Sequence, residues 1–410
     1  MEHRVAVTGI GVISIYGDSP SVLFDALCDG HTGIHPVGSM PRNDCACHLS
    51  GQLIDFQSDR YLKGRPLRPL DRVSQLASSA CGLALEDSGW DAEDRSIVDL
   101  ALMVGTMFAG MHTIGDFDRT AIVSGPASVS PMAFANTVIS AAAGQTAIWH
   151  NMRGANSTVA MGSISGIAAV GHAADSIRRG TSEAALAGGV DEFSVESFCG
   201  FDRAGLLCKN STEPERPIPF DQHRNGFALG EGAGFLALEE LTYAGERGST
   251  VLAEIKGYAT AFDYSQGKNR ELAVRTLART MRTALERSGK TIHDIDFVSA
   301  SANGSVPQDC YELMALASVF AQRARDLPVT AIKCGTGEAL AASGPLQLAV
   351  AIDTLRTGRL PGIIGLAELP PSCPLQGIQA ETRDIRARNG LINGVGLDGN
   401  CCSLVIGLPD

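Results

Sequence analysis

The chain has 410 residues and a formal net charge of −12, with 44% hydrophobic residues, 19% charged residues and 46 glycines. This acidic balance disfavours nucleic-acid binding, which requires a basic surface to displace counterions. The apolar content disfavours disorder, and no apolar run approaches the roughly 20 residues of a membrane span. We therefore expect a cytoplasmic protein with an extensive core that contacts neither nucleic acid nor membrane.

The 11 cysteines are scattered and show no even framework of spacings. This distribution predicts reduced thiols rather than disulfides. Cys45, Cys47 and His48 form the one local cluster with metal-ligand chemistry, but its spacing is shorter than C-x2-C and no second pair follows. We expect no metal and no cofactor.

Expected strands and helices alternate along the whole chain, which predicts a layered α/β fold. The expected strands cover residues 4–14, 98–106, 183–193, the end of 219–241, 251–262, 297–302, 329–333 and 401–408. The expected helices cover residues 21–28, 70–90, 130–149, 271–289, 310–320 and 335–355. Residues 36–69 are rich in Pro, Gly and polar residues and are expected to form a surface loop.

Residues 156–180 combine a short β-branched strand, a sharp turn through Gly162 and Ser163, and a helix rich in Gly and Ala. Such a turn places Ser163 at a helix N-terminus, where free N–H groups favour negative charge. Residues 335–337 (Gly-Thr-Gly) precede a second helix of small residues. This echo predicts an internal duplication with halves at 1–245 and 250–410.

Three segments carry a resemblance to a known family. They are PFDQHRNGFALGEGAGFLALEE at 219–240, GIAAVGHAADSIRRG at 166–180 and IKCGTGEALAASG at 332–344. The chain resembles the β-ketoacyl-acyl-carrier-protein synthases of the thiolase superfamily from residue 4 to residue 408. This resemblance implies a thiolase-like five-layered αβαβα fold, built from two pseudo-repeated halves and normally dimeric.

The family's condensation chemistry uses a cysteine thiolate at a helix N-terminus and two histidines. The resemblance places Ser163 at the cysteine position and Ser301 and Glu338 at the histidine positions, while the family lysine is retained as Lys333. His172 is expected to be a core residue rather than a base. Because a serine without an adjacent base is a poor nucleophile, the sequence predicts no condensing activity and no catalytic residue.

A ketosynthase-like chain without these groups resembles the chain length factor, or ketosynthase β subunit, of type II polyketide synthases. That resemblance implies a transferase-class heterodimer in which an active ketosynthase α subunit contacts the acyl carrier protein and the two subunits enclose the growing polyketide chain. Members of aromatic polyketide pathways carry Gln at the position of Ser163, so a polyene-type pathway is also allowed.

The same resemblance places two segments, 107–117 and 130–138, at the dimer interface beside the chain tunnel. The tunnel or interface candidates are Phe108, Met111, His112, Phe117, Met132, Ala133 and Phe134. The alternative for each is packing at the interface alone. A weak carrier-protein contact is assigned to Arg65, Arg68 and Arg72, with a solvated surface as its alternative.

Two other functions remain open. The first is an active acyltransferase, or a malonyl-carrier-protein decarboxylase, that uses Ser163 with help from Lys333 and Glu338. The second is a homodimeric scaffold or binding protein without a tunnel.

Overall fold

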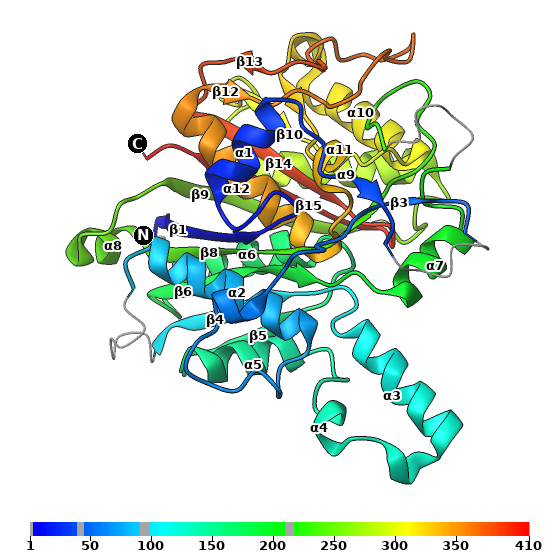
Figure 1. Ribbon diagram of the computed structural model, residues 1–410. Coiled ribbons are helices and arrows are strands. Elements are labelled where there is room, and N and C mark those ends of the chain that lie inside the picture. The colour runs from blue at the N-terminus through cyan, green and yellow to red at the C-terminus, as the bar shows by residue number, and fades with distance from the viewer. Residues whose placement is uncertain (1–2, 39–44, 91–98, 210–216, 410) are drawn as a thin grey trace.

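The computed structural model describes residues 3–38, 45–90, 99–209 and 217–409 (Figure 1). Ten strands form one sheet in the order β11-β10-β14-β15-β9-β1-β8-β6-β4-β5. In that order the strands are Val329–Thr330, Phe297–Ser299, Asn389–Val395, Asn400–Gly407, Ala253–Phe262, Val5–Ile13, Gly232–Glu240, Ala184–Asp191, Ala101–Gly105 and Asn156–Val159.

The sheet consists of two halves with the same strand arrangement. In the first half β5, β4 and β6 are parallel, and β8 and then β1 continue the sheet in antiparallel fashion. In the second half β11, β10 and β14 are parallel, and β15 and then β9 continue it in the same way. Ala6 and Val7 of β1 pair with Glu254 and Ala253 of β9 and join the halves. The two halves therefore repeat one strand arrangement, as the predicted thiolase-like fold implies, while the boundaries 1–245 and 250–410 stay a prediction.

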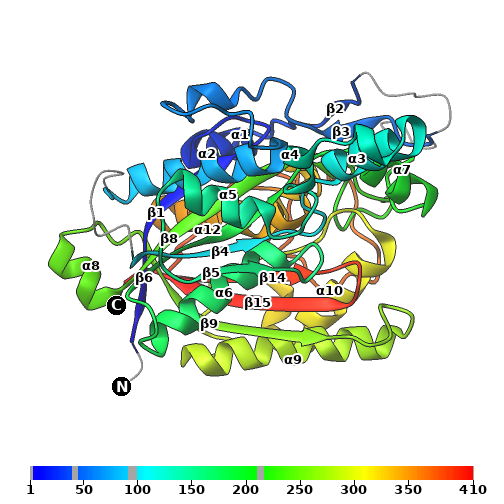
Figure 2. The same ribbon diagram turned by 90° about the horizontal axis from the view of Figure 1, so that it is seen from below.

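Helices form the three other layers of the fold. The central layer contains α6 (Ser165–Arg178) and α12 (Ser343–Thr357), which pack against each other between the two halves of the sheet. The first half is covered outside by α2 (Arg72–Asp87) and α5 (Ala141–Trp149), and the second by α9 (Arg270–Ser288) and α10 (Val306–Phe320) (Figure 2).

Small residues allow the central layer to pack closely. A Cβ atom on Gly166 of α6 would lie 2.0 Å from the carbonyl oxygen of Ala341, and one on Gly171 would lie 2.2 Å from the ring of Tyr258. Side chains at these positions would separate the halves. The Gly and Ala content of α6 is thus a packing requirement. His172 on the same helix is exposed, so its expected core position is wrong; its ring packs edge-on against Tyr258 at 5.7 Å between centroids.

The remaining elements lie outside the ten-stranded sheet and the six helices described so far. The helices are α1 (Pro20–Cys28), α3 (Met111–Ser124), α4 (Pro131–Phe134), α7 (Val195–Arg203), α8 (Leu241–Arg247) and α11 (Lys333–Thr336). The short strands are β2 (His35–Pro36), β3 (Leu49–Gly51), β7 (Leu229–Gly230), β12 (Arg359–Leu360) and β13 (Arg383–Asp384). Short 3-10 turns occur at Ser58–Arg60, Pro126–Ser128, Ala321–Arg325 and Leu340–Ala342.

Three expectations for local structure are wrong. The expected helix 130–149 is two helices, α4 and α5, with a turn-containing segment between them. The expected helix 335–355 is interrupted, because Gly337 has φ +73° and ends α11 before α12 begins at Ser343. Lys333 opens α11 rather than ending a strand. Among the described helices, none combines the length and apolar character needed to cross a membrane.

Candidate functional site

The turn before α6 holds Ser163 in a fixed position. Gly162 has φ +62°, a conformation that favours glycine. The Ser165 hydroxyl donates to the Gly162 carbonyl oxygen at 2.6 Å and accepts from the Met161 amide at 2.8 Å. Ser163 is 6% exposed. Its position just before the N-terminus of α6 is therefore as predicted, and the helix dipole there would favour an anion.

Ser301, Lys333 and Glu338 come together in one buried polar cluster. Lys333 Nζ donates to Glu338 Oε2 at 2.8 Å and lies 3.3 Å from Ser301 Oγ. Asn303 Nδ2 also donates to Glu338 Oε2, at 2.9 Å, and the Ser343 hydroxyl donates to Glu338 Oε1 at 2.8 Å. The Glu338 carboxylate thus has a partner at both oxygens, and its charge faces the Lys333 ammonium. Sequence reasoning missed Asn303 and Ser343, since their roles depend on contacts across the fold.

A second carboxyl group supports the segment that bears Ser301. Glu312 on α10 accepts from the Ser301 amide and from Asn393 Nδ2, both at 3.0 Å. Burial raises the pKa of Glu312 to about 7. The backbone at Ser301 is therefore fixed from both the helix and the sheet.

The loop between β14 and β15, together with the strand ends on either side of it (residues 394–400), connects the Ser163 turn with the Ser301 cluster. The Val395 amide donates to Ser301 Oγ at 2.9 Å. Gly394 leaves room for Ile164, whose Cγ2 atom would lie 3.1 Å from a Cβ atom added there. The carboxylate of Asp398 covers Gly162, because a Cβ atom on Gly162 would lie 2.5 Å from Asp398 Oδ2. A negative charge therefore lies next to the Ser163 turn. Sequence reasoning missed Asp398, although its position between Gly396 and Gly399 could have singled it out.

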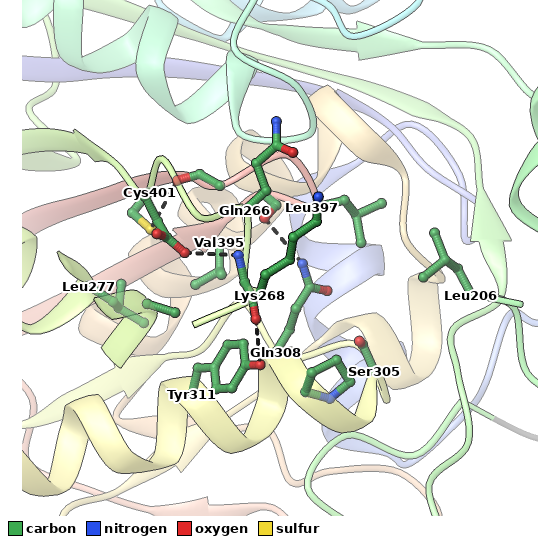
Figure 3. Close-up of a pocket in the computed structure, with 16 residues that line it drawn as sticks. Leu206, Gln266, Lys268, Leu277, Ser305, Gln308, Tyr311, Val395, Leu397 and Cys401 are labelled. Carbon is green, nitrogen blue, oxygen red and sulfur yellow. Dashed lines mark hydrogen bonds between the residues drawn. The ribbon is translucent and has the colours of Figure 1, made fainter. Parts of the chain in front are cut away.

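A pocket of about 230 Å³ lies on the far side of the same loop (Figure 3). Val395, Leu397 and Tyr311 line it together with Lys268, which is exposed. Gln308 fixes the loop by donating to the Gly396 carbonyl oxygen at 3.1 Å. The residues that line the pocket include neither Ser163 nor members of the Lys333–Glu338 cluster. The pocket thus borders this loop without including the predicted site residues.

The buried carboxylate of Asp191, at the end of β6, organises the first of the two segments predicted to lie beside a tunnel. It accepts from the Thr106 hydroxyl at 2.8 Å and from the backbone amides of Met107, Phe108 and Ala341 at 2.9–3.0 Å. Burial raises the pKa of Asp191 to about 6, and these donors oppose the rise. One acid therefore holds the ends of two strands and the turn before α12 together.

The seven predicted tunnel or interface residues occupy two different environments. Phe108 packs inward on Phe201, with 5.8 Å between ring centroids. Phe117 and Phe134 bring α3 and α4 together, with 6.1 Å between ring centroids. Met111 and Ala133 are half-buried, and Met132 and His112 are exposed. His112 also forms an i,i+4 contact of 3.4 Å with Asp116.

Helix α3 projects from the body of the molecule together with α4 (Figure 1). None of its 14 residues is buried. Ile122 and Val123 at its end are 82% and 78% exposed. Seven of the fourteen exposed large apolar side chains among the described residues fall between positions 122 and 148, namely Ile122, Val123, Met132, Phe134, Val138, Ile139 and Ile148. Such a concentration on one side is typical of an interaction surface.

The three arginines predicted to contact the carrier protein differ in the bonds that they make within this chain. Arg72 Nη2 donates to Glu231 Oε2 at 2.9 Å, and the Glu231 side chain is fully buried. Arg65 Nη1 donates to the carbonyl oxygens of Ile148 and Trp149 at the end of α5. Arg68 is exposed. Arg72 therefore has a structural role that leaves little of its charge for an external partner.

The ten-stranded sheet with its three helical layers is a thiolase-like α/β fold of the kind found in ketosynthases. The beta-ketoacyl synthase N-terminal domain model matches residues 2–244, and the C-terminal domain model matches residues 252–367. The chain therefore belongs to the beta-ketoacyl synthase family.

Individual relatives agree with this assignment. The chain is 27% identical over 407 residues to 3-oxoacyl-[acyl-carrier-protein] synthase 2 of Coxiella burnetii, covering 99% of this chain and 98% of that protein. A solved structure described as the ishigamide ketosynthase/chain length factor matches with a TM-score of 0.92 at 28% identity, over the full length of both chains. A type II PKS acyl-carrier protein in complex with its ketosynthase matches with a TM-score of 0.90 at 22% identity over both full lengths, which shows the fold alone.

Proposed function

We propose that this chain is a chain length factor: a non-catalytic subunit that pairs with an active ketosynthase and shapes the tunnel for a polyketide or polyene chain. The observation that carries the proposal is α3, a helix of 14 residues with no buried member. A helix with exposed Ile122 and Val123 at its end is expected to pack against another protein.

The edge of the sheet points to the same kind of assembly. β5 pairs with β4 and is the last strand of the ten-stranded sheet. An exposed edge strand offers unpaired N–H and C=O groups to a second chain. Strand and helix surfaces together would supply a much larger contact than α3 alone.

The chemistry of the site supports a subunit without its own condensing activity. We take Ser163, Ser301 and Glu338 to stand where the family's cysteine and histidines act. The last histidine of the chain is His293, so the segment 301–338 carries no imidazole. The Lys333 ammonium is paired with Glu338, and Asp398 places a negative charge beside Gly162. An oxyanion or enolate would be destabilised there rather than stabilised.

In the proposed assembly the acyl carrier protein docks mainly on the ketosynthase partner, with Arg65 or Arg68 as a minor contact. The growing chain would pass near Phe117, Ala133 and Phe134. The ishigamide ketosynthase/chain length factor, which has the same fold at 28% identity, supports this assignment.

The test is co-expression with candidate ketosynthase α subunits of type II polyketide synthases, followed by size-exclusion chromatography. We expect a stable one-to-one heterodimer. Ile122→Asp should weaken its formation at least tenfold, whereas Ile54→Asp, at a position 66% exposed elsewhere, should not. A homodimer that no ketosynthase disrupts would contradict the proposal.

Mass spectrometry of this chain after incubation with acyl- and malonyl-carrier proteins tests the enzymatic alternative. We expect no covalent adduct and no decarboxylation by the chain alone. An acyl group on Ser163 would favour the acyltransferase, and loss of carbon dioxide that depends on Lys333 would favour the decarboxylase.

A further inference from the structure

Four cysteines far apart in the sequence form two close pairs at one rim of the fold. Cys45 Sγ lies 3.9 Å from Cys199 Sγ on α7, and the two residues are 154 positions apart. Cys47 Sγ lies 3.6 Å from Cys208 Sγ. None of the four belongs to a disulfide. Two such contacts in one place are not expected from the scattered cysteine pattern.

The two pairs differ in access to solvent. Cys45 and Cys199 are half-buried, so a small oxidant can reach them. Cys47 and Cys208 are 2% and 0% exposed and belong to a hydrophobic cluster with Phe198 and Phe201. Cys47 also donates its thiol to the Leu49 carbonyl oxygen. The buried Cys47–Cys208 pair therefore serves as a control for the half-buried Cys45–Cys199 pair.

The backbone around Cys45 is held in place by α7. Both carboxylate oxygens of Asp202 accept from the Ala46 amide at 3.1 Å, and one accepts from the Cys47 amide at 2.9 Å. Because Asp202 and Cys199 lie on the same helix, these bonds keep the two sulfur atoms facing each other. Among the described residues, no three side chains gather that could hold a metal ion, so the sulfur atoms meet as pairs.

We propose that Cys45 and Cys199 are a redox-responsive pair that forms a reversible disulfide with a low-molecular-weight disulfide such as oxidised glutathione. The Cys199 thiolate attacks one sulfur of the oxidant and releases one molecule of reduced glutathione. The Cys45 thiol then loses its proton, attacks the mixed disulfide at Cys199 and releases the second. Two protein thiols are oxidised and one glutathione disulfide is reduced to two thiols.

The proton on Cys45 must leave before this thiol can react. Burial, and then the neighbouring Cys199, raise the pKa of the Cys45 thiol to about 11, so that little of it is thiolate at neutral pH. Once Cys199 carries glutathione, the intramolecular step is favoured by the short distance between the two sulfur atoms. A disulfide needs a sulfur separation of about 2.0 Å, so side-chain rotation must close the remaining gap.

The bond would connect the segment before β3 to α7, and α7 contacts α3. Arg119 Nη2 of α3 lies 3.8 Å from Glu196 Oε1 of α7, and a Cβ atom on Gly115 would lie 2.6 Å from the same oxygen. Oxidation would therefore stiffen the support of the exposed helix. This inference rests on the cysteine geometry and does not depend on the proposed function.

The test uses the full chain, purified with reductant and then incubated with oxidised glutathione. Alkylation and non-reducing peptide mapping should show a mass loss of about 2 Da and one Cys45–Cys199 crosslinked peptide, reversed by dithiothreitol. Thermal unfolding of the oxidised protein should shift to higher temperature. Cys47 and Cys208 should stay free.

Two variants separate this pair from general thiol oxidation. Cys45→Ser should leave a stable glutathione adduct on Cys199, whereas Cys310→Ser, at a half-buried cysteine whose recorded contact is with Met314, should form the crosslink as before. The proposal is overturned if the wild-type peptide map shows all four thiols unmodified, single glutathione adducts only, or oxidation of Cys47 and Cys208 first. The wild-type map gives this answer even if a variant fails to fold.

Discussion

The Nζ atom of Lys333 lies 2.8 Å from Oε2 of Glu338, and their side chains are 3% and 1% exposed. A buried charge pair of this kind is costly to break, because the remaining charge loses its partner and cannot reach water. The pair is five residues apart in sequence, on opposite sides of the Gly337 turn. It therefore fixes both the turn and the entry into α12.

Removal of one member should destabilise the protein. We expect Lys333→Met to lower the free energy of unfolding by about 3–5 kcal/mol, since it leaves Glu338 with hydrogen-bond donors but no opposite charge. Urea denaturation measures this change. The double variant Lys333→Met with Glu338→Met should regain most of the loss. If the double variant were no more stable than the single one, the pair would not be the cause.

Asp398 should suppress the reactivity of a nucleophile at position 163. In Ser163→Cys, the nearby carboxylate should raise the pKa of the introduced thiol, so that iodoacetamide reacts slowly at neutral pH. Adding Asp398→Asn should increase the alkylation rate by about threefold to tenfold. The pH dependence of the rate, followed by mass spectrometry, distinguishes a pKa effect from a change in access. Equal rates in both variants would show that Asp398 does not act on this turn.

Glu192 should make stability fall as the pH rises. Burial raises the pKa of Glu192 to about 8. The hydrogen bond from the His112 amide opposes this rise, and the charges of Asp71 and Glu231 add to it. Its pKa in the unfolded chain is about 4.3. Between these values the folded state binds more protons than the unfolded state, so the free energy of unfolding decreases with rising pH.

The Glu192→Gln variant tests this pH dependence. Its stability relative to the parent should increase by roughly 4 kcal/mol between pH 5 and pH 8.5, as measured by urea unfolding. Glu271→Gln, at an exposed position in the first turn of α9, is the control and should show no such trend. Parallel pH profiles for the parent and Glu192→Gln would refute the assignment.

Phe108 and Phe134 should respond differently to truncation. Phe108→Ala should lower the free energy of unfolding by about 2–3 kcal/mol, because the ring packs on Phe201 and its loss leaves a cavity. Phe134 is 60% exposed, so Phe134→Ala should change the stability of the isolated chain by less than about 0.5 kcal/mol. Chemical denaturation of both variants checks this contrast.

The contrast also guides tests of product length in the reconstituted heterodimer. Phe134→Ala should allow a longer product and Ala133→Phe should give a shorter one, without loss of the fold. An unchanged product distribution for both would remove these residues from the tunnel.

The sequence alone determined the type of fold and its repetition. Alternating strands and helices required a layered structure, and the Gly- and Ala-rich segment at 166–177 required a helix packed at close range, because only small residues permit that approach. Ser163 could be placed at a helix N-terminus because Gly162 supplies the left-handed turn that joins strand to helix. Local patterns sufficed for these features.

Only the tertiary structure decided which side chains act together. Asp398 lies 236 positions after Gly162 and covers it because β14 and β15 bring their connecting loop to the start of α6. The Cys45–Cys199 contact and the four donors to Asp191 likewise join distant segments. The exposure of α3 could not be read from its composition, since an apolar residue is buried or exposed according to what the rest of the chain, or a partner, places against it.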